Sequence, residues 1–498
     1  MKFNAVDLGY AAPFLILAAT GMLLVIGEAF FRGRDRSGLM GLAVAGSLAS
    51  LAASVLAFRE VGSDPHPIFG DMLIADRVGY ALSGLFSVTT ALVAMMLPAH
   101  QRAHEWENGE SYAILLMSAA GMVILAQAGN LVTVFLGIET MSIGVYAMTA
   151  LRRRSKRGNE AALKYFLMGA FATGFLLYGM ALVYGAAGTT SLVDLQQKLT
   201  QTANPSLAIA GILLMVVAFG FKVGAVPFHM WVPDAYEGAP TPVTAFMAAA
   251  VKSAAVAAMI RTFGQFLGGS ILPFGAVGWG GALAVLAAIT ITLGNIAAVR
   301  QDNIKRMLAY SSISHGGVLL AGLAAMGLNY DASHADQLDA VFGSQSAIVY
   351  YLIAYSITTV GAFAIVTWVG NKDRERLLVD DWAGLGVRHP AAALAMTVCL
   401  LSLGGMPPTS GFFAKFYIFK SAMDVPNAQL LWLVIIGVVN SAISIYYYLR
   451  IVTAMYFREP TEPFTPSRSA PLSVVIALCA IFILVQGVLP GFWLGLGH

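Results

Sequence analysis

Four ionisable side chains lie in the middle of long apolar runs. They are Glu139 in GNLVTVFLGIETMSIGVYAM, Lys222 in MVVAFGFKVGAVPFHMW, Lys252 in PVTAFMAAAVKSAAVAAM and Lys415 in SGFFAKFYIF. Each of these groups can gain or lose a proton, so together they could transfer protons along a path. A charge at the centre of a bilayer costs about 2.5–3.5 kcal/mol on insertion scales, so four that faced lipid would cost roughly 10 kcal/mol. We therefore expect all four to face the protein interior or a hydrated cavity.

The combination of one carboxylate with three ammonium groups suggests a transfer mechanism. A carboxylate about 6 Å from an ammonium stabilises it by roughly 3 kcal/mol at an effective dielectric constant of about 20. Moving Glu139 relative to Lys222, or changing its protonation, would therefore load or unload a proton on the lysine. In this hypothesis Lys252 relays the proton between the two halves of the chain, and Lys415 is the exit. The alternative is a structural role, in which buried Lys–Glu pairs only hold helices in register.

Three further groups are weaker candidates for the same path: Lys305 and His315 in NIKRMLAYSSISHGG, and His229 in PFHMW. A position at the membrane interface would explain Lys305 equally well, and a lone histidine is more often a satisfied core residue. Arg152 and Lys164 lie near the ends of predicted spans, where we expect them to anchor helices at the interface.

The composition indicates the elements that must hold these groups. The 498 residues are 58% apolar and 11% charged, with a mean hydropathy of +0.75, whereas globular domains carry roughly 25% charged residues. This indicates a polytopic membrane protein. The net charge of +3 is too small to indicate nucleic-acid binding. The two cysteines, Cys399 and Cys479, lack metal-ligand spacing and are expected to be small buried hydrophobic residues.

The apolar runs predict about fourteen membrane-spanning helices, each needing about 20 residues. The first, from about Leu8 to Phe31, is too long for a cleavable signal peptide. The predicted centres lie near residues 19, 48, 88, 120, 140, 173, 216, 251, 289, 317, 356, 405, 440 and 480.

Basic loops predict the orientation. The basic loops FRGRDRSG, LRRRSKRGNE, RQDNIKR, NKDRERLL and YFREPTEPFTPSR all follow odd-numbered spans. Loops after even-numbered spans, such as NYDASHADQLD, are neutral or acidic. Because short loops rich in Lys and Arg remain in the cytoplasm, we expect both termini on the periplasmic side.

Two predicted spans are interrupted by glycine and proline, in GFKVGAVPFH with Pro227 and in SLGGMPPTSGFFAK with Pro407. Broken helices in corresponding places of two halves are typical of inverted-repeat transporters. The interrupted spans are the seventh and twelfth, which fits inverted five-helix repeats of spans 4–8 and 9–13, each with a discontinuous helix. The expected division is a three-helix part at 1–110, repeats at 111–262 and 278–458, and a C-terminal helix at 459–498.

The runs FKVGAVPFHMWVPDAYEGAPTPVTAF, VKSAAVAAMIR and GGMPPTSGFFAKFYIF resemble the antiporter-like membrane subunits of respiratory complex I. The resemblance covers nearly the whole chain. It is greatest to the N-type branch, because Lys415 occupies a position where M-type subunits have a glutamate. The chain also stops soon after the fourteenth span, without the lateral helix of L-type subunits.

The resemblance implies a proton-translocating subunit of bacterial NADH:quinone oxidoreductase in the inner membrane. It assigns Glu139, Lys222, Lys252 and Lys415 to proton transfer, and His229, Lys305 and His315 to a polar central axis. It implies no cofactor or metal in this chain, with flavin, iron–sulfur clusters and quinone in partner subunits. The implied partners are other membrane subunits, including a neighbouring antiporter-like subunit and small helical subunits, together with lipids.

Two rival interpretations remain open from the sequence. The first is a subunit of a cation/proton antiporter or a membrane-bound hydrogenase, which share the same motifs. The second is a structural membrane subunit whose buried charges conduct nothing.

Overall fold

The chain forms a bundle of long helices. The computed structural model describes residues 5–31, 37–62, 65–266, 278–329, 338–370, 375–460, 466–467 and 469–497. Within these ranges the strands form one antiparallel hairpin of β1 (His66–Ile68) and β2 (Leu73–Ala75). Apart from this hairpin, the regular elements of the described chain are helices, so the predicted all-α membrane fold is confirmed. Parts of the loops that predicted orientation, at 32–36, 330–337, 371–374 and 461–465, lie outside the described residues.

The helices follow one another along the chain with short connections. The first half contains α1 (Ala5–Phe31), α2 (Ser37–Glu60), α3 (Arg77–Ala103), α4 (Glu110–Ala126), α5 (Leu131–Thr149), α6 (Lys156–Ala187), α7 (Leu192–Thr200), α8 (Pro205–Val223), α9 (Trp231–Gly238), α10 (Thr241–Phe246), the π-helix η1 (Met247–Val251) and α11 (Lys252–Phe266). The second half contains α12 (Gly278–Val299), α13 (Ile304–Leu328), α14 (Leu338–Val369), η4 (Val379–Trp382), α15 (Leu385–Arg388), α16 (Pro390–Gly404), α17 (Ser410–Met423), η5 (Pro426–Ala428), α18 (Leu431–Phe457), α19 (Ala470–Val488), α20 (Pro490–Leu494) and η6 (Gly495–Gly497).

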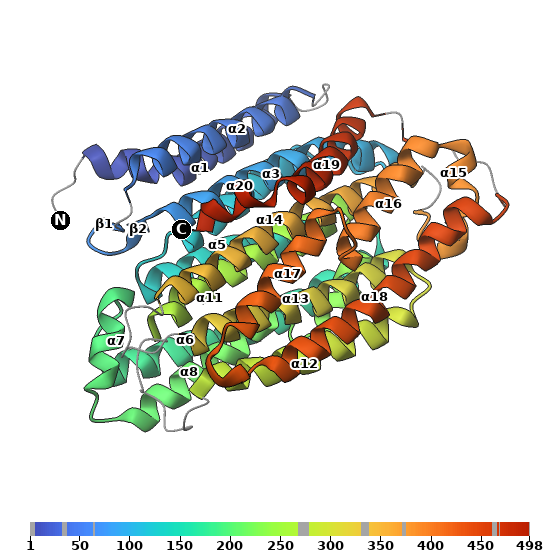
Figure 1. The fold of residues 1–498 in the computed structure, drawn as a ribbon. Coiled ribbons are helices and arrows are strands. Elements are labelled where there is room, and N and C mark those ends of the chain that lie inside the picture. The colour runs from blue at the N-terminus through green and yellow to red at the C-terminus, as the bar shows by residue number, and fades with distance from the viewer. Residues whose placement is uncertain are drawn as a thin grey trace.

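Twelve helices of the described chain are long and apolar enough to cross a membrane, and α4 and α16 are shorter apolar helices. Each predicted span centre lies inside a helix except residue 405, which lies in the break between α16 and α17. The start of α1, the hairpin, α7 and the end of α20 lie toward one end of the bundle, and α15 lies at the other (Figure 1). Termini at one end fit the even number of crossings that the sequence predicts.

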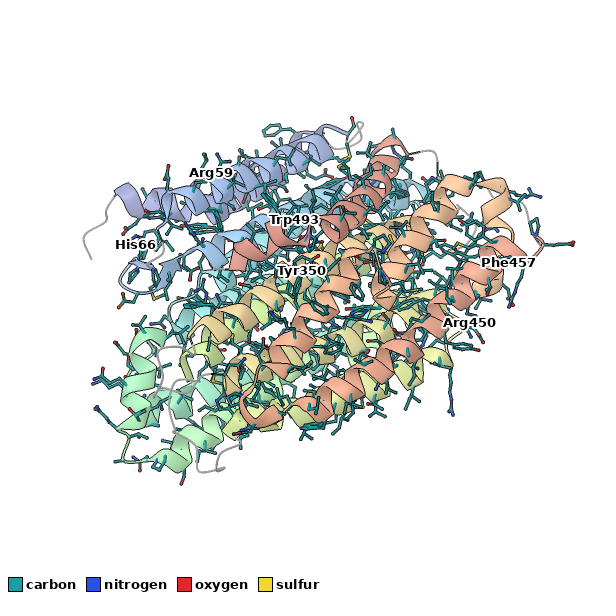
Figure 2. The ribbon with its side chains drawn as sticks, in the orientation of Figure 1. Arg59, His66, Tyr350, Arg450, Phe457 and Trp493 are labelled. Carbon is teal, nitrogen blue, oxygen red and sulfur yellow. The ribbon has the colours of Figure 1, made fainter. Side chains whose placement is uncertain are left out.

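Burial separates inner from outer helices. The apolar stretches of α10–α11, α14, α13 and α3 are 100, 94, 89 and 83% buried, whereas those of α1, α2, α6 and α19 are each 33% buried. The outer helices present large apolar side chains such as Phe457, while Tyr350 lies inside the bundle (Figure 2). The innermost helices α11 and α13 carry Lys252, Lys305 and His315, so these groups face protein and not lipid.

Both broken spans end their first half at a glycine. Gly224 follows α8 with a φ of 78°, and Gly405 follows α16 with a φ of 80°. Glycine adopts this left-handed conformation without a steric penalty. At Gly405 a side chain would also collide with Lys415, because a Cβ there would lie 2.9 Å from Lys415 Cδ. The chain becomes helical again at α9 and α17, so the interruptions predicted near Pro227 and Pro407 are observed.

Candidate functional site

Lys222 lies in the last turn of α8 and is 4% exposed. Its ammonium donates hydrogen bonds to Ser142 Oγ at 2.7 Å and Tyr146 OH at 3.1 Å, both on α5. Glu139 lies one turn before Ser142, and its carboxylate accepts a hydrogen bond from Thr173 Oγ1 at 2.8 Å. Among the described residues, no ion pair within 4.0 Å joins Glu139 to Lys222. The structure thus brings the two groups to neighbouring helices, with hydroxyl oxygens and not the carboxylate at the ammonium.

Helix ends provide negative charge to two of the lysines. The C-terminal end of an α-helix carries a partial negative charge from its unpaired carbonyl groups. Lys222 stands at that end of α8. Lys415, on α17, donates a hydrogen bond at 3.0 Å to the carbonyl oxygen of Gly404, the last residue of α16. The broken helices therefore stabilise buried ammonium groups without a neighbouring carboxylate.

Lys252 begins α11 directly after the π-helix η1 and is 3% exposed. A π-turn adds a residue to the helical turn and is frequent at functional sites. The Lys252 ammonium contacts the carbonyl oxygen of Ser312, and its distance to Ser312 Oγ is 2.5 Å. A Cβ at Gly316 would lie 3.0 Å from the Val223 carbonyl oxygen and 3.5 Å from Lys252 Nζ. Gly316 therefore lets the end of α8 and the Lys252 side chain pack closely against α13.

Hydroxyl groups and one imidazole continue this polar line beyond Lys252. Tyr355 OH donates to Ser312 Oγ at 2.8 Å, and the Tyr355 ring lies 4.9 Å from the His315 ring. His315 Nδ1 lies 2.5 Å from Tyr351 OH, and its Nε2 lies 3.4 Å from Tyr448 OH. Hydroxyl and neutral imidazole groups both donate and accept hydrogen bonds. The cluster therefore has the chemistry of a proton relay.

His315 and Lys415 line the same small cavity, which connects the relay to the second broken helix. The cavity offers about 10 Å³ to the centre of a water molecule, and one water needs about 10–15 Å³ by this measure. Other polar groups on its wall are Asn295, Ser314, Asn440, Ser441, Ser444 and Tyr447. The structure thus places Lys252, His315 and Lys415 along one buried polar line. Lys222 lies at the end of the neighbouring helix α8, where its contacts run to the helix that carries Glu139.

The two remaining candidates lie to the side of this line. His229 lies in the turn between α8 and α9, and its Nδ1 has no hydrogen-bond partner among the described residues. Lys305 lies at the start of α13 and is fully buried, with its ammonium 2.7 Å from the Ala239 carbonyl oxygen. Lys305 therefore contacts protein groups at the start of its helix, and its position at the depth of the membrane interface stays a prediction.

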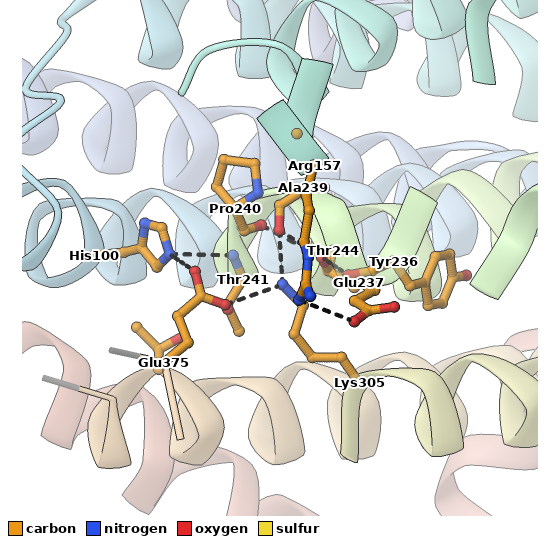
Figure 3. A network of polar contacts seen from close by, with 12 residues as sticks. His100, Arg157, Tyr236, Glu237, Ala239, Pro240, Thr241, Thr244, Lys305 and Glu375 are labelled. Atoms are coloured by element: carbon orange, nitrogen blue, oxygen red, sulfur yellow. Dashed lines mark hydrogen bonds and ion pairs between the residues drawn. The ribbon is translucent and has the colours of Figure 1, made fainter. Parts of the chain in front are cut away.

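Sequence reasoning missed a cluster around Glu375, in the loop after α14 (Figure 3). Its Oε1 lies 3.1 Å from Arg152 Nη1, 3.3 Å from His100 Nε2 and 3.8 Å from His104 Nε2, and its Oε2 lies 3.4 Å from Lys305 Nζ. Burial alone would raise the pKa of the Glu375 carboxyl, but Lys305 and His100 outweigh burial and hold that pKa well below its usual range. The one sequence signal was the spacing of His100 and His104, which puts them on one helix face.

His100, His104 and Glu375 also have ligand atoms close enough together to hold a metal ion, all within 4.8 Å of one another. The hydrogen bonds favour an ion cluster instead. The indole of Trp106 can only donate, and it donates to His100 Nδ1 at 3.0 Å. A neutral His100 then carries its proton on Nε2, facing Glu375. A metal would have to displace that proton and compete with Lys305 for the carboxylate.

Acid is expected to destabilise the fold through His104. Burial lowers the pKa of His104 from 6.5 to about 4. The unfolded chain therefore binds a proton at His104 more tightly than the folded chain does. The contribution of the neutral imidazole to the free energy of unfolding is complete above about pH 6.5 and is lost as the pH falls towards 4. We expect the thermal unfolding midpoint of the purified protein in detergent to fall over this range, and to fall less in His104→Gln. The exposed His66 provides the matched control, His66→Gln. Identical pH profiles for His104→Gln and the unaltered protein would contradict this prediction.

Comparisons with known proteins show the family of the chain. The family model described as NADH:quinone oxidoreductase/Mrp antiporter, TM, matches residues 128–444. The chain is 42% identical to NADH-quinone oxidoreductase subunit N 1 of Sorangium cellulosum, over 97% of this chain and 96% of the relative. A chain of respiratory complex I from Thermus thermophilus is 32% identical with a TM-score of 0.79, covering 97% of this chain and 98% of that chain. A chain of the Mrp complex from a Dietzia species has a TM-score of 0.83 at 21% identity, covering 99% of this chain and 96% of that chain. That last likeness concerns the fold alone.

Proposed function

Because the chain belongs to the subunit N family of NADH-quinone oxidoreductase, we propose that it moves protons across the membrane while other subunits transfer the electrons. The chain is thus a subunit of a proton-pumping oxidoreductase and carries out no redox step itself. The observation that supports this role best is the buried polar line from Lys252 through His315 to Lys415, with the buried Lys222 at the end of the neighbouring helix α8.

In the proposed mechanism, Lys252 is the central proton-binding group. A proton that leaves Lys252 passes through Ser312 to Tyr355, then across the small cavity that Tyr355 shares with His315, and from His315 across a second small cavity to Lys415. On the other side, Ser142 and Tyr146 connect the Lys222 ammonium to the helix that carries Glu139. Because like charges repel, protonation of one lysine favours proton release from its neighbour.

The two broken helices support a division into inverted repeats, with α4–α11 at about 111–262 and α12–α18 at about 278–458. In each unit the first half-helix ends at a left-handed glycine and its carbonyl end lies beside a lysine. Helix α4 packs against α5, as α12 packs against α13. Residues 1–110 and 459–498 would then flank the repeats.

The orientation and partners follow from the same role. We place the chain in the bacterial inner membrane, with its basic loops in the cytoplasm and both termini in the periplasm. We expect flavin, iron–sulfur clusters and quinone in partner subunits. The partners would be the other membrane subunits, including a neighbouring antiporter-like subunit and small helical subunits, together with lipids.

The rival role in a cation/proton antiporter receives less support. The Mrp chain shares the fold at 21% identity, whereas the subunit N relative is 42% identical over nearly the whole chain. A purely structural role is a different class of function, and the following experiment separates it from proton transfer.

Lys222→Met is expected to reduce the protons pumped per electron in the assembled complex. Methionine keeps a long unbranched side chain in the buried site but cannot carry a proton. Loss of a positioned proton-transfer group typically slows that transfer by about 10²–10⁴-fold. The measurement is NADH-driven proton uptake by vesicles that contain the purified complex. Lys198→Met, at an exposed position on α7, is the matched control. An assembled Lys222→Met complex that pumps normally would instead support the structural role.

A further inference from the structure

We propose that Glu375 is a positioning residue for proton transfer, because it holds Lys305 and through Lys305 the start of the span that carries Lys252. This inference rests on the proposed function. Glu375 lies outside the line from Lys252 to Lys415, and its carboxylate touches no group on that line.

The contacts of Lys305 are the first step. Its buried ammonium lies 2.7 Å from the Ala239 carbonyl oxygen and 3.4 Å from Glu375 Oε2 (Figure 3). The other carboxylate in this region, Glu237, is held by Arg306 at 2.8 Å and by Asn303 at 3.1 Å. Glu375 is therefore the one carboxylate that pairs with Lys305 within 4.0 Å in the described chain.

The second step links Ala239 to the central lysine. Ala239 joins α9 to α10, which opens the span containing Lys252. In α9, just before this junction, Tyr236 OH lies 3.3 Å from Ser312 Oγ, the oxygen that contacts Lys252. Thr244, in α10, donates to the Tyr236 carbonyl oxygen at 2.9 Å. A shift of this junction therefore changes the contact between Ser312 and Lys252.

The balance of charge explains why Glu375 controls the junction. One carboxylate faces the two cations Lys305 and Arg152, while His104 is neutral near pH 7. Removing one partner of a buried ion pair leaves the other uncompensated, which is strongly unfavourable. Without the charge of Glu375, Lys305 and Arg152 would repel each other, and the Lys305–Ala239 contact would give way. Because the same carboxylate contacts His100 and His104 on α3, it also connects the N-terminal helices to this junction.

The test is Glu375→Gln in the assembled complex, with proton uptake and NADH oxidation measured in the same vesicles. Small misplacements of reacting groups can cost about 10²-fold, and we expect proton translocation to fall roughly 10- to 100-fold. If Glu375 acts through Lys305, then Glu375→Gln combined with Lys305→Met will be no slower than Lys305→Met alone. Glu375→Asp should recover part of the activity. Asp380→Asn is the matched control, because it removes an 80% exposed carboxylate close by in the sequence.

The outcomes separate this inference from the proposed function. Normal pumping in Glu375→Gln would overturn the positioning role, and so would additive losses in the Glu375→Gln, Lys305→Met double variant. The proposed function would survive either result as long as Lys252→Met fails to pump. Normal pumping in Lys252→Met would instead refute the proposed function. If the complex with Glu375→Gln does not assemble, the test moves to the double variant with Lys305→Met, because that variant also removes the Lys305 ammonium that would be left unpaired. Failure of that variant to assemble would make Glu375 a folding residue and overturn the inference.

Discussion

Lys252→Met is expected to stop proton translocation through this chain while the complex still assembles. The site is 3% exposed, so an apolar side chain of similar length fits there. The substitution avoids the cost of burying an ammonium group, and this offsets the loss of its hydrogen bonds to Ser312. The variant lacks the central proton-binding group, and transfer should fall by about 10²-fold or more. Proton uptake by vesicles during NADH oxidation is the measurement. The thermal unfolding midpoint reports whether the fold is retained.

Lys252→Arg separates proton exchange from fixed charge. A guanidinium keeps the positive charge but does not release its proton under these conditions. We therefore expect Lys252→Arg to fail in the same way as Lys252→Met. Normal pumping by the arginine variant would mean that Lys252 acts only as a fixed charge, which contradicts the proposed mechanism.

Lys415→Met is expected to have the second largest effect. It removes the proton-binding group at the cavity shared with His315 and leaves the Gly404 carbonyl without its side-chain donor. The lost donor should cost about 1–3 kcal/mol of stability, and proton transfer should fall by about 10²-fold. Both the unfolding midpoint and the protons pumped per electron should therefore decrease.

The matched control for Lys415 lies on the same helix. Lys420 is exposed near the C-terminal end of α17, so Lys420→Met should leave pumping and assembly unchanged. Equal pumping by the two methionine variants would show that the position of Lys415 beside the broken helix has no role in proton transfer.

Most of the fold follows from the sequence because a bilayer imposes simple rules. Apolar runs of about 20 residues located the helices, and Pro227 and Pro407 marked the two breaks. The hairpin, the short helix α7 and the π-helix before Lys252 were not predicted. The apolar run around Lys252 fits an α-helix and a π-helix equally well, and packing against neighbouring helices decides between them.

The candidate site was predictable only in part. Cost in lipid identified Lys222, Lys252, Lys415 and Glu139. The three lysines are buried, whereas Glu139 is only half-buried. Their partners depend on helix rotation, so Ser142, Ser312 and the other hydroxyl groups could not be distinguished from the many hydroxyls of the sequence.

Glu139 and Glu375 show the same limit for carboxylates. Glu139 was expected beside Lys222, but hydroxyls occupy the nearest positions around that ammonium. Glu375 lies in the charged run NKDRERLL, which resembles an ordinary cytoplasmic loop. Only tertiary structure brings it to Lys305.

The central claim is that Lys252 and Lys415 serve one continuous path. The number of protons pumped per electron by the double variant Lys252→Met with Lys415→Met tests this claim most directly, because losses at groups in series do not add. We predict that the double variant pumps as many protons per electron as either single variant, and fewer than the unaltered complex. A ratio equal to that of the unaltered complex, or a stepwise further loss in the double variant, would contradict a single path.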